Sequence, residues 1–320
     1  MTSRLGFDQL GLPSGKRARL RRILYQQGLR NGTTLFLPYD QGLEHGPRDF
    51  FANETATDPR YILRLAIEGG FNGIAIQIGL AEKFYWEYAG EVPLILKLNG
   101  KTDIPDDTAP LSPLNATVEE AVALGADAVG YTLYVGTPAQ AVDFEQFRVV
   151  RADAARLGMP LIVWAYPRGP AITAKGGTDS FYAVDYAARV ASELGADMIK
   201  VNFPRPQKRS GVRAEYDAVF SDEQAIGAVV RSANRSLLLV SGGEKVGDEA
   251  MLTKARLTME AGGTGLIFGR NVWQRTHLEA MHFVAALRAV LAEYPSPEKS
   301  LWVGATSVAS APDPRFVPVD

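Results

Sequence analysis

Eight short apolar runs recur along the chain, and their number and spacing constrain the fold more than any other feature. They cover residues 33–39, 73–78, 93–98, 126–133, 160–166, 196–203, 236–241 and 265–269. Most are nearly continuous stretches of Val, Ile and Leu with little alternation, which is typical of parallel strands buried on both faces. The pattern predicts eight buried parallel strands.

Amphipathic stretches lie between these runs and keep apolar positions at spacings of three and four residues, as helices do. They cover residues 59–69, 117–124, 137–157, 180–194, 222–232 and 248–261. Alternation of strands and helices produces a parallel sheet, and eight strands favour a closed barrel over an open doubly wound sheet. The glycine fingerprint of a dinucleotide-binding sheet is also missing after the first run. We therefore expect an α/β fold with a single (β/α)8 TIM barrel.

The chain of 320 residues exceeds the roughly 250 residues that such a barrel needs. We expect an N-terminal helical extension at 1–32, the barrel at 33–294 and an irregular, proline-rich tail at 295–320. Basic residues crowd the extension between Lys16 and Arg22. We interpret this stretch as a solvated helix that covers one end of the barrel.

Charge and composition exclude several classes of protein. The formal net charge is −2, so no overall field attracts nucleic acid or anionic membranes. No apolar run approaches the roughly 18 residues of a membrane span, and the N-terminus lacks the apolar core of a secretory signal. The absence of cysteine excludes disulfides and thiolate nucleophiles and fits a reducing compartment. We expect a cytoplasmic protein without nucleic-acid or membrane partners.

Lys200 is the most unusual residue in the predicted barrel, because it lies within the apolar run 196–203. Catalytic groups of this fold come from the C-terminal ends of strands. A buried ammonium is costly, so such a lysine is usually ion-paired, reaching solvent or kept as a nucleophile. Lowering its pKa from about 10.4 toward 7 to 8 would free the amine for a Schiff base. We favour the nucleophile over a structural ion pair.

Other reactive side chains lie in or directly after other predicted strands. Asp40 follows the first strand, Lys97 lies in the third, and Trp164 and Tyr166 lie in the fifth. Lys97 is a second cation that could lower the pKa of Lys200. His45, after the first strand, either lines the mouth of the barrel or stabilises its loop.

Two glycine-containing loops follow the last two predicted strands. The loops after strands seven and eight form the recurrent phosphate site of this fold, because glycine lets backbone amides approach an anion closely. Arg270 adds a fork of charged donors. We expect a phosphate site rather than two ordinary turns, formed by Ser241, Gly242, Gly243, Gly269 and Arg270, with Glu244 and Lys245 following in the first loop.

Histidine is too scarce for a His-rich metal site. The chain has three histidines, His45, His277 and His282, and the last two are five residues apart on a predicted outer helix, where they face different directions. We therefore expect neither a metal nor another cofactor.

Six segments together resemble a known family, the archaeal-type (DhnA/DeoC-like) class I fructose-bisphosphate aldolases. They are residues 38–47, 96–102, 164–169, 199–201, 241–243 and 269–271, and the resemblance spans about 33–291. It implies that Lys200 is the Schiff-base lysine and Tyr166 the proton-transfer residue. It also implies that Trp164 positions the substrate and that Asp40 lies near the reacting hydroxyls. A common family form has His after this aspartate, where the present chain has Gln41.

The resemblance implies reversible cleavage of fructose 1,6-bisphosphate into dihydroxyacetone phosphate and glyceraldehyde 3-phosphate, with fructose 1-phosphate as another candidate substrate. The two glycine loops would hold the ketose 1-phosphate. The resemblance also implies a homo-oligomer.

Two other functions fit parts of the pattern. A transaldolase-like heptulosonate synthase or a thiolase of the same superfamily would share Lys200 and the phosphate loops. The polar segment Lys97, Asn99 and Lys101 favours a sugar bisphosphate, because it suits a phosphorylated distal end. A non-catalytic sugar-phosphate-binding barrel is disfavoured because both Lys200 and Tyr166 are present.

Overall fold

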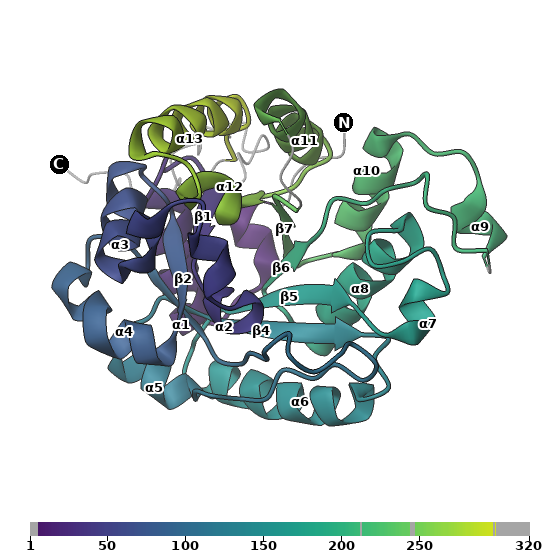
Figure 1. The fold of residues 1–320 in the computed structure, drawn as a ribbon, viewed down its shortest axis with the longest axis horizontal. Coiled ribbons are helices and arrows are strands. Elements are labelled where there is room, and N and C mark those ends of the chain that lie inside the picture. The colour runs from purple at the N-terminus through teal and green to yellow at the C-terminus, as the bar shows by residue number, and fades with distance from the viewer. Residues whose placement is uncertain (1–5, 212, 244–246, 297, 299–320) are drawn as a thin grey trace, which may run out of the picture.

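The computed structural model describes residues 6–211, 213–243, 247–296 and 298. Its centre is a closed barrel of eight parallel strands that follow one another in chain order (Figure 1). The strands are β1 (Thr34–Pro38), β2 (Gly73–Gln77), β3 (Leu94–Lys97), β4 (Ala128–Val135), β5 (Leu161–Pro167), β6 (Met198–Val201), β7 (Leu237–Ser241) and β8 (Gly265–Ile267). All eight predicted strands and the closed barrel are confirmed.

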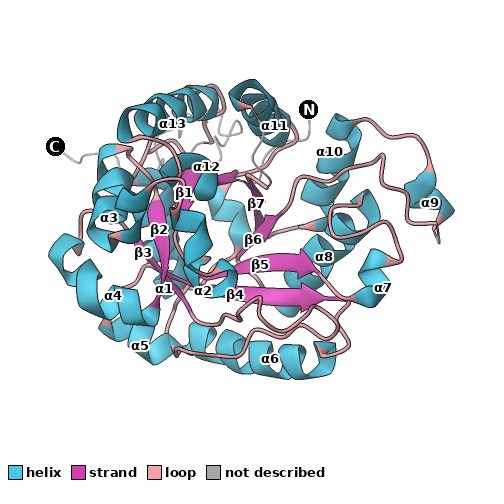
Figure 2. Cartoon of the chain, in the orientation of Figure 1, coloured by secondary structure: helices cyan, strands magenta, loops and turns pink. Residues whose placement is uncertain are grey.

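Helices surround the strands (Figure 2). The outer helices are α3 (Pro59–Glu68), α4 (Ile78–Phe84), α5 (Val118–Ala123), α6 (Gln140–Arg156), α8 (Phe181–Leu194), α10 (Asp222–Ser232), α11 (Asp248–Glu260) and α13 (His277–Ala292). The six helices predicted by range are confirmed, and α4 is an addition. Within the described residues, no helix has the length and apolar character needed to cross a membrane.

Short helices occupy several connections. They are α2 (Gly42–His45), α7 (Pro170–Thr173), α9 (Ala214–Asp217), α12 (Arg270–Trp273) and the 3-10 turns η1 (Phe7–Leu10), η2 (Pro47–Phe50), η3 (Glu54–Thr57) and η4 (Tyr85–Tyr88). Of these, α2 and α12 follow β1 and β8 directly and lie at the end of the barrel where catalytic groups are expected.

The N-terminal segment closes the opposite end of the barrel. Helix α1 (Ser14–Tyr25) buries Leu20 and Ile23 in one cluster with the inward-facing Phe36 and Ile95. Lys16 Nζ donates to Asp197 Oδ2 at 2.6 Å, just before β6. Arg22 pairs in the same way with Asp127, just before β4. The helix therefore covers this end of the barrel as predicted, but the stretch is not simply solvated, because Lys16 is buried and both Lys16 and Arg22 form ion pairs with the barrel. The site is confined to the other end.

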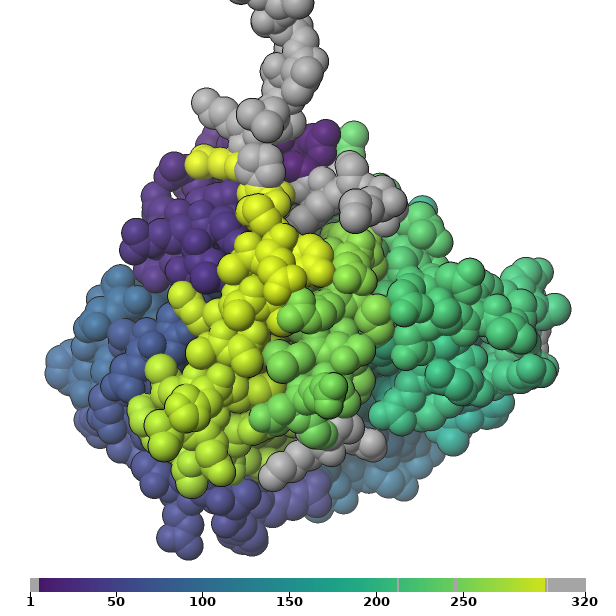
Figure 3. Space-filling view, turned by 90° about the horizontal axis from the view of Figure 1, so that it is seen from above, coloured from purple at the N-terminus to yellow at the C-terminus, as the bar shows by residue number. Residues whose placement is uncertain are grey.

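The last helix, α13, completes the ring of helices around the barrel. Figure 3 shows α13, in yellow-green, between the green α11 and the purple and blue segments from the start of the chain. Ser296 N donates to Asn31 O at 2.7 Å and holds the end of this region beside the start of the barrel. The division of the chain at 32/33 and 294/295 stays a prediction, and 297 and 299–320 of the predicted tail lie outside the described residues.

Candidate active site

A cavity of about 490 Å³ opens at the C-terminal end of the strands. All of the predicted site residues except Lys97 line it: Asp40, His45, Trp164, Tyr166, Lys200, Ser241, Gly242, Gly243, Gly269 and Arg270. These residues come from five strands or the loops directly after them. The barrel therefore brings together groups that are up to 230 positions apart in the sequence.

Lys200 enters the cavity from β6, and only 7% of the residue is exposed. No carboxylate of the described residues forms an ion pair with its amine. Burial lowers the pKa of Lys200 from 10.5 to about 8. The negative charges of Asp40 and Glu44 raise this pKa, and the positive charges of Arg270 and Arg168 lower it further. At pH 7 about one amine in ten is then neutral, compared with about 0.03% at a pKa of 10.5. The environment thus supplies a nucleophilic amine near neutral pH.

Two aromatic rings of β5 form a wall beside this amine. The strand register places Trp164 directly beside Lys200, and the amine lies 5.3 Å from the Trp164 ring and 5.2 Å from the Tyr166 ring. Gly130 of β4 makes room for the indole, since a Cβ atom at this position would lie 2.8 Å from the Trp164 ring. Gly130 was not predicted as a site residue, and its only signal in the sequence was a glycine inside a predicted strand.

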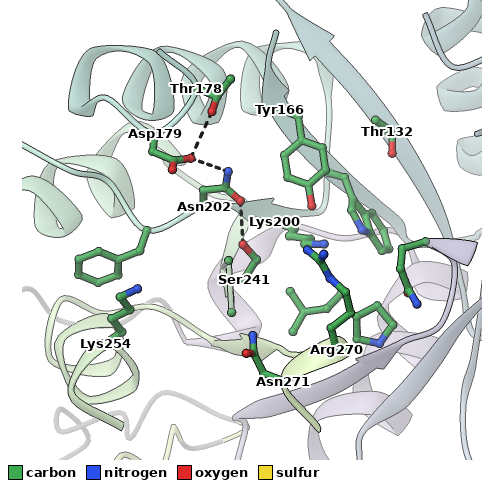
Figure 4. Close-up of a pocket in the computed structure, with 18 of the residues that line it drawn as sticks. Thr132, Tyr166, Thr178, Asp179, Lys200, Asn202, Ser241, Lys254, Arg270 and Asn271 are labelled. Atoms are coloured by element: carbon green, nitrogen blue, oxygen red, sulfur yellow. Dashed lines mark hydrogen bonds between the residues drawn. The ribbon is translucent and has the colours of Figure 1, made fainter. Parts of the chain in front are cut away.

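Tyr166 is held in its protonated form. Burial raises the pKa of the Tyr166 phenol, and the negative charges of Glu44 and Asp40 raise it further. In Figure 4 the side chains of Tyr166, Lys200 and Arg270 converge on the same space. A neutral phenol next to the amine can donate a proton to a group bound there.

Lys97 does not line the cavity, which corrects one predicted substrate contact. Its Nζ lies 3.3 Å from Asp40 Oδ2 and donates to Thr132 Oγ1 at 2.8 Å. Burial lowers the pKa of Lys97, and Asp40 opposes this effect. Lys97 therefore holds in place the carboxylate of Asp40, which does line the cavity. The charge of Lys200 also lowers the Lys97 pKa, so the two ammonium groups repel each other, as expected.

Asn99 is not available to a substrate either. It is fully buried; its amide donates to Ser112 O and Thr132 O, and its Oδ1 accepts from Thr132 N at 2.7 Å. Every polar atom of this side chain is used within the protein, in hydrogen bonds to β4 and to the loop after β3. The predicted contact of Asn99 with the distal end of a substrate is therefore wrong.

The two glycine loops lie side by side, as predicted. A Cβ atom on Gly242 would lie 2.5 Å from Asn271 Nδ2, and one on Gly269 would lie 2.7 Å from the carbonyl oxygen of Pro38. Gly242 therefore leaves room for the Asn271 side chain of the neighbouring loop, and Gly269 lets its own loop approach the backbone at the end of β1. Arg270 extends beside them with its side chain 42% exposed. Glu244 and Lys245 lie outside the described residues.

A hydrogen-bonded row fixes Ser241 at the edge of the cavity (Figure 4). Asn202 Nδ2 donates to Asp179 Oδ1 at 2.8 Å, so the Asn202 oxygen faces Ser241 and accepts from its hydroxyl at 2.8 Å. Thr178 joins the same carboxylate. Asn202 was not predicted as a site residue, although it follows Lys200 by two residues and so lies on the same face of the chain.

His45 belongs to a polar group at the rim. Its Nδ1 lies 2.7 Å from Asp49 Oδ2, and Arg270 Nε lies 3.8 Å from the same oxygen. The imidazole both lines the cavity and stabilises the loop after β1, so the two predicted roles are combined. Among the described residues, no group of three or more His, Asp or Glu side chains is arranged to hold a metal ion.

Glu44 and Arg168 also line the cavity and were not predicted as site residues. The Glu44 carboxylate accepts from the Tyr134 hydroxyl at 3.2 Å, and the Arg168 guanidinium lies 5.2 Å above the Tyr166 ring. Arg168 follows Tyr166 by two residues, so the two-residue period of β5 was a signal for it. For Glu44 the signal was its place in the polar segment after the first strand.

Comparison with known proteins identifies the relatives of this chain. The model of the DeoC/LacD family of aldolases matches residues 34–275. A class 1 fructose-bisphosphate aldolase of Thermoproteus tenax is 42% identical over 259 residues, which cover 81% of this chain and 89% of the relative. The corresponding enzyme of Halobacterium salinarum is 37% identical over 276 residues, which cover 85% and 95%.

A solved structure agrees with these relatives. It is an archaeal fructose 1,6-bisphosphate aldolase in which the catalytic lysine is covalently bound to the carbinolamine intermediate of the substrate. It shares 39% identity with this chain and superimposes with a TM-score of 0.73, covering 85% of this chain and 99% of its own. The similarity therefore includes the whole barrel.

Proposed function

Because the chain belongs to the DeoC/LacD family of aldolases, we propose that it is a class I fructose-bisphosphate aldolase, a carbon-carbon lyase that works through a Schiff base on Lys200. Its reaction is the reversible cleavage of fructose 1,6-bisphosphate into dihydroxyacetone phosphate and glyceraldehyde 3-phosphate. The observation that carries the proposal is the buried amine of Lys200, whose pKa is lowered to about 8 between two aromatic rings.

The covalent steps require a neutral amine and an electron sink. The Lys200 nitrogen adds to the C2 carbonyl carbon of the ketose, and loss of water from the carbinolamine leaves an iminium ion. The iminium accepts the electron pair of the C3–C4 bond when this bond breaks, so no metal is needed. Glyceraldehyde 3-phosphate leaves first, and hydrolysis of the remaining adduct releases dihydroxyacetone phosphate.

We assign proton transfer to Tyr166, and its protonated state sets the order of the transfers. The phenol first gives its proton to the hydroxyl that leaves the carbinolamine, and the phenolate then takes the proton of the C4 hydroxyl. The re-formed phenol protonates C3 of the enamine, and the phenolate accepts a proton from the water that hydrolyses the iminium. Each time Tyr166 loses its proton, the positive charges of Arg168 and Arg270 stabilise the resulting phenolate.

The remaining residues orient the substrate. We assign Asp40, held by Lys97, to the hydroxyl groups next to the reacting bond, and Trp164 to the flat face of the Schiff base. The 1-phosphate is assigned to the amides of Ser241, Gly242, Gly243 and Gly269, together with the charge of Arg270. His45 supports Arg270 through Asp49.

The test combines trapping with turnover. The protein is incubated with dihydroxyacetone phosphate or fructose 1,6-bisphosphate and borohydride, and intact mass and peptide mapping then locate the adduct. A coupled cleavage assay is run beside it. An adduct on Lys200 with turnover is expected. An adduct without bisphosphate cleavage would assign the chain to the heptulosonate synthases or thiolases, and no adduct would refute the Schiff base.

We further infer a cytoplasmic homo-oligomer that has neither nucleic acid nor membrane as a partner. The support for this inference is the absence of cysteine, the nearly balanced charge and the kinship with the aldolases above. Sedimentation of the purified chain tests the oligomer, and a monomeric mass would contradict it.

A further inference from the structure

A buried threonine in the wall of the cavity is held at three of its atoms. Thr132 of β4 lines the cavity and is 2% exposed. Its backbone nitrogen donates to Asn99 Oδ1 at 2.7 Å, and its carbonyl oxygen accepts from Asn99 Nδ2 at 2.8 Å. Its side-chain oxygen, Oγ1, accepts from Lys97 Nζ at 2.8 Å. The hydroxyl group of Thr132 therefore has a fixed position at the edge of the site.

The bond from Lys97 determines where the hydroxyl proton of Thr132 points. An ammonium group has donors only, so the Thr132 oxygen must be the acceptor in this bond, and its own proton is directed elsewhere. In the part of the chain that the structure describes, no acceptor is bonded to this proton. A buried donor without a partner is unfavourable, so the proton is available to a ligand in the cavity. In Figure 4 Thr132 lies on the same side of the cavity as Tyr166.

The same ammonium group also holds a carboxylate that lines the cavity. Asp40 Oδ2 lies 3.3 Å from Lys97 Nζ, and Asp40, like Thr132, faces the cavity that Lys97 itself does not line. An ionised carboxylate only accepts hydrogen bonds, whereas the Thr132 hydroxyl has a proton to donate. Lys97 therefore holds an acceptor and a donor on one wall of the site. This combination matches an alcohol, which both donates and accepts, and not a carbonyl or phosphate oxygen, which only accepts.

The pair has a defined position relative to the reacting amine. The strand register places Thr132 beside Trp164, and Trp164 beside Lys200. The amines of Lys97 and Lys200 lie 5.1 and 5.3 Å from the same Trp164 ring. The loops assigned to the 1-phosphate follow β7 and β8, on the other side of β6. A ketose attached to Lys200 through C2, with C1 toward these loops, therefore directs C3 and its hydroxyl toward β5 and β4.

We propose that Thr132 and Asp40 together bind the C3 hydroxyl of the ketose, with Thr132 as donor and Asp40 as acceptor, and so select dihydroxyacetone phosphate as the ketone. This inference rests on the proposed function, because it takes the substrate carbonyl to be attached to Lys200. Hydroxyacetone phosphate has a methyl group in place of this hydroxymethyl group. It would leave both the donor and the acceptor unpaired, which is costly in a buried site. A held hydroxyl also stops rotation about the C2–C3 bond, so the enamine forms with one geometry.

The test compares two ketones that differ at this hydroxyl. The protein is incubated with borohydride and increasing concentrations of dihydroxyacetone phosphate or hydroxyacetone phosphate, and intact mass gives the concentration for half-maximal adduct formation. In the wild type this concentration is expected to be about 10-fold or more higher for hydroxyacetone phosphate. Thr132→Val removes the hydroxyl with little change of shape. It is expected to raise the concentration about 2- to 10-fold for dihydroxyacetone phosphate and to leave that for hydroxyacetone phosphate unchanged.

Two further variants serve as controls. Thr34→Val makes the same change at the start of β1, where the buried Thr34 hydroxyl has no hydrogen-bond partner among the described residues, and is expected to affect neither ligand. Thr132→Ser keeps the hydroxyl and is expected to keep the preference for dihydroxyacetone phosphate.

Two results would overturn the subsite and leave the proposed function standing. Equal weakening of both ligands in Thr132→Val would mean that Thr132 only supports Lys97. Equal half-maximal concentrations of the two ligands in the wild type would mean that the hydroxyl is not bound. If the wild type formed no adduct with either ligand, the proposed function itself would be refuted.

Discussion

Replacement of Lys200 by methionine is expected to stabilise the fold, because the protein keeps a costly buried ammonium for its chemistry. The pKa of this lysine is 10.5 in its ordinary state and about 8 in the folded chain. At about 1.4 kcal/mol for each pKa unit, charging the amine in the folded state costs about 3 kcal/mol. Lys200→Met removes this cost and fills a similar volume, so its free energy of unfolding at pH 7 is expected to exceed that of the wild type.

The pH dependence separates the electrostatic cost from the packing of the new side chain. Because the folded-state pKa is lowered, the unfolded chain holds more protons between pH 8 and 10.5, and the stability of the wild type rises with pH in this window. Below pH 8 the full cost is present, and above pH 10.5 it is gone. The advantage of Lys200→Met is therefore expected to shrink by about 3 kcal/mol between pH 7 and pH 10.5.

Urea denaturation followed by tryptophan fluorescence at pH 7 and pH 10.5 measures this change. Lys83→Met, which replaces an exposed lysine of α4, controls for the loss of one ammonium group. The difference between its free energy of unfolding and that of the wild type is expected to be the same at both pH values. If the advantage of Lys200→Met were the same at both pH values, Lys200 would not have a lowered pKa in the folded chain, and the argument for its nucleophilicity would fail.

Three other variants or treatments test the site. Tyr166→Phe is expected to keep the dihydroxyacetone phosphate adduct on Lys200 and to slow cleavage about 10²- to 10⁴-fold in the coupled assay, and near-normal cleavage would contradict its role in proton transfer. Gly130→Ala is expected to displace Trp164, lowering the free energy of unfolding by about 1 to 3 kcal/mol and reducing kcat/KM. Urea denaturation and the cleavage assay check this, and an unchanged kcat/KM would mean that the indole does not position the substrate. A chelator is expected to leave cleavage unaffected, because the iminium is the electron sink, and recovery of lost activity by a divalent ion would point to a different mechanism.

The barrel could be predicted because its signals are local. Each buried parallel strand reads as a short apolar run, and each outer helix repeats its apolar positions every three or four residues. The helix α4 was not predicted, since it is short and follows β2 without an intervening turn. Lys200 and Tyr166 could be identified for a related reason, because a reactive side chain that interrupts an apolar run is conspicuous in the sequence.

The partners of these side chains could not be predicted in the same way. Lys97 and Lys200 look alike in the sequence, since each lies within an apolar strand. In the structure Lys97 is paired with Asp40, whereas Lys200 faces the cavity beside Trp164. The difference depends on the stagger of neighbouring strands and on side chains from the loop after β1, neither of which a single strand encodes.

The sequence by itself determined the order of the strands, the end of the barrel that carries the chemistry and most of the side chains that face it. These follow from periodicity within one segment and from the parallel arrangement, which brings all C-terminal strand ends to one side. Only the tertiary structure decided that Asn99 is internal and that Lys97 holds both Asp40 and Thr132. Such contacts join segments far apart in the chain, and their distances and burial, which set charge and pKa, exist only after the barrel has closed.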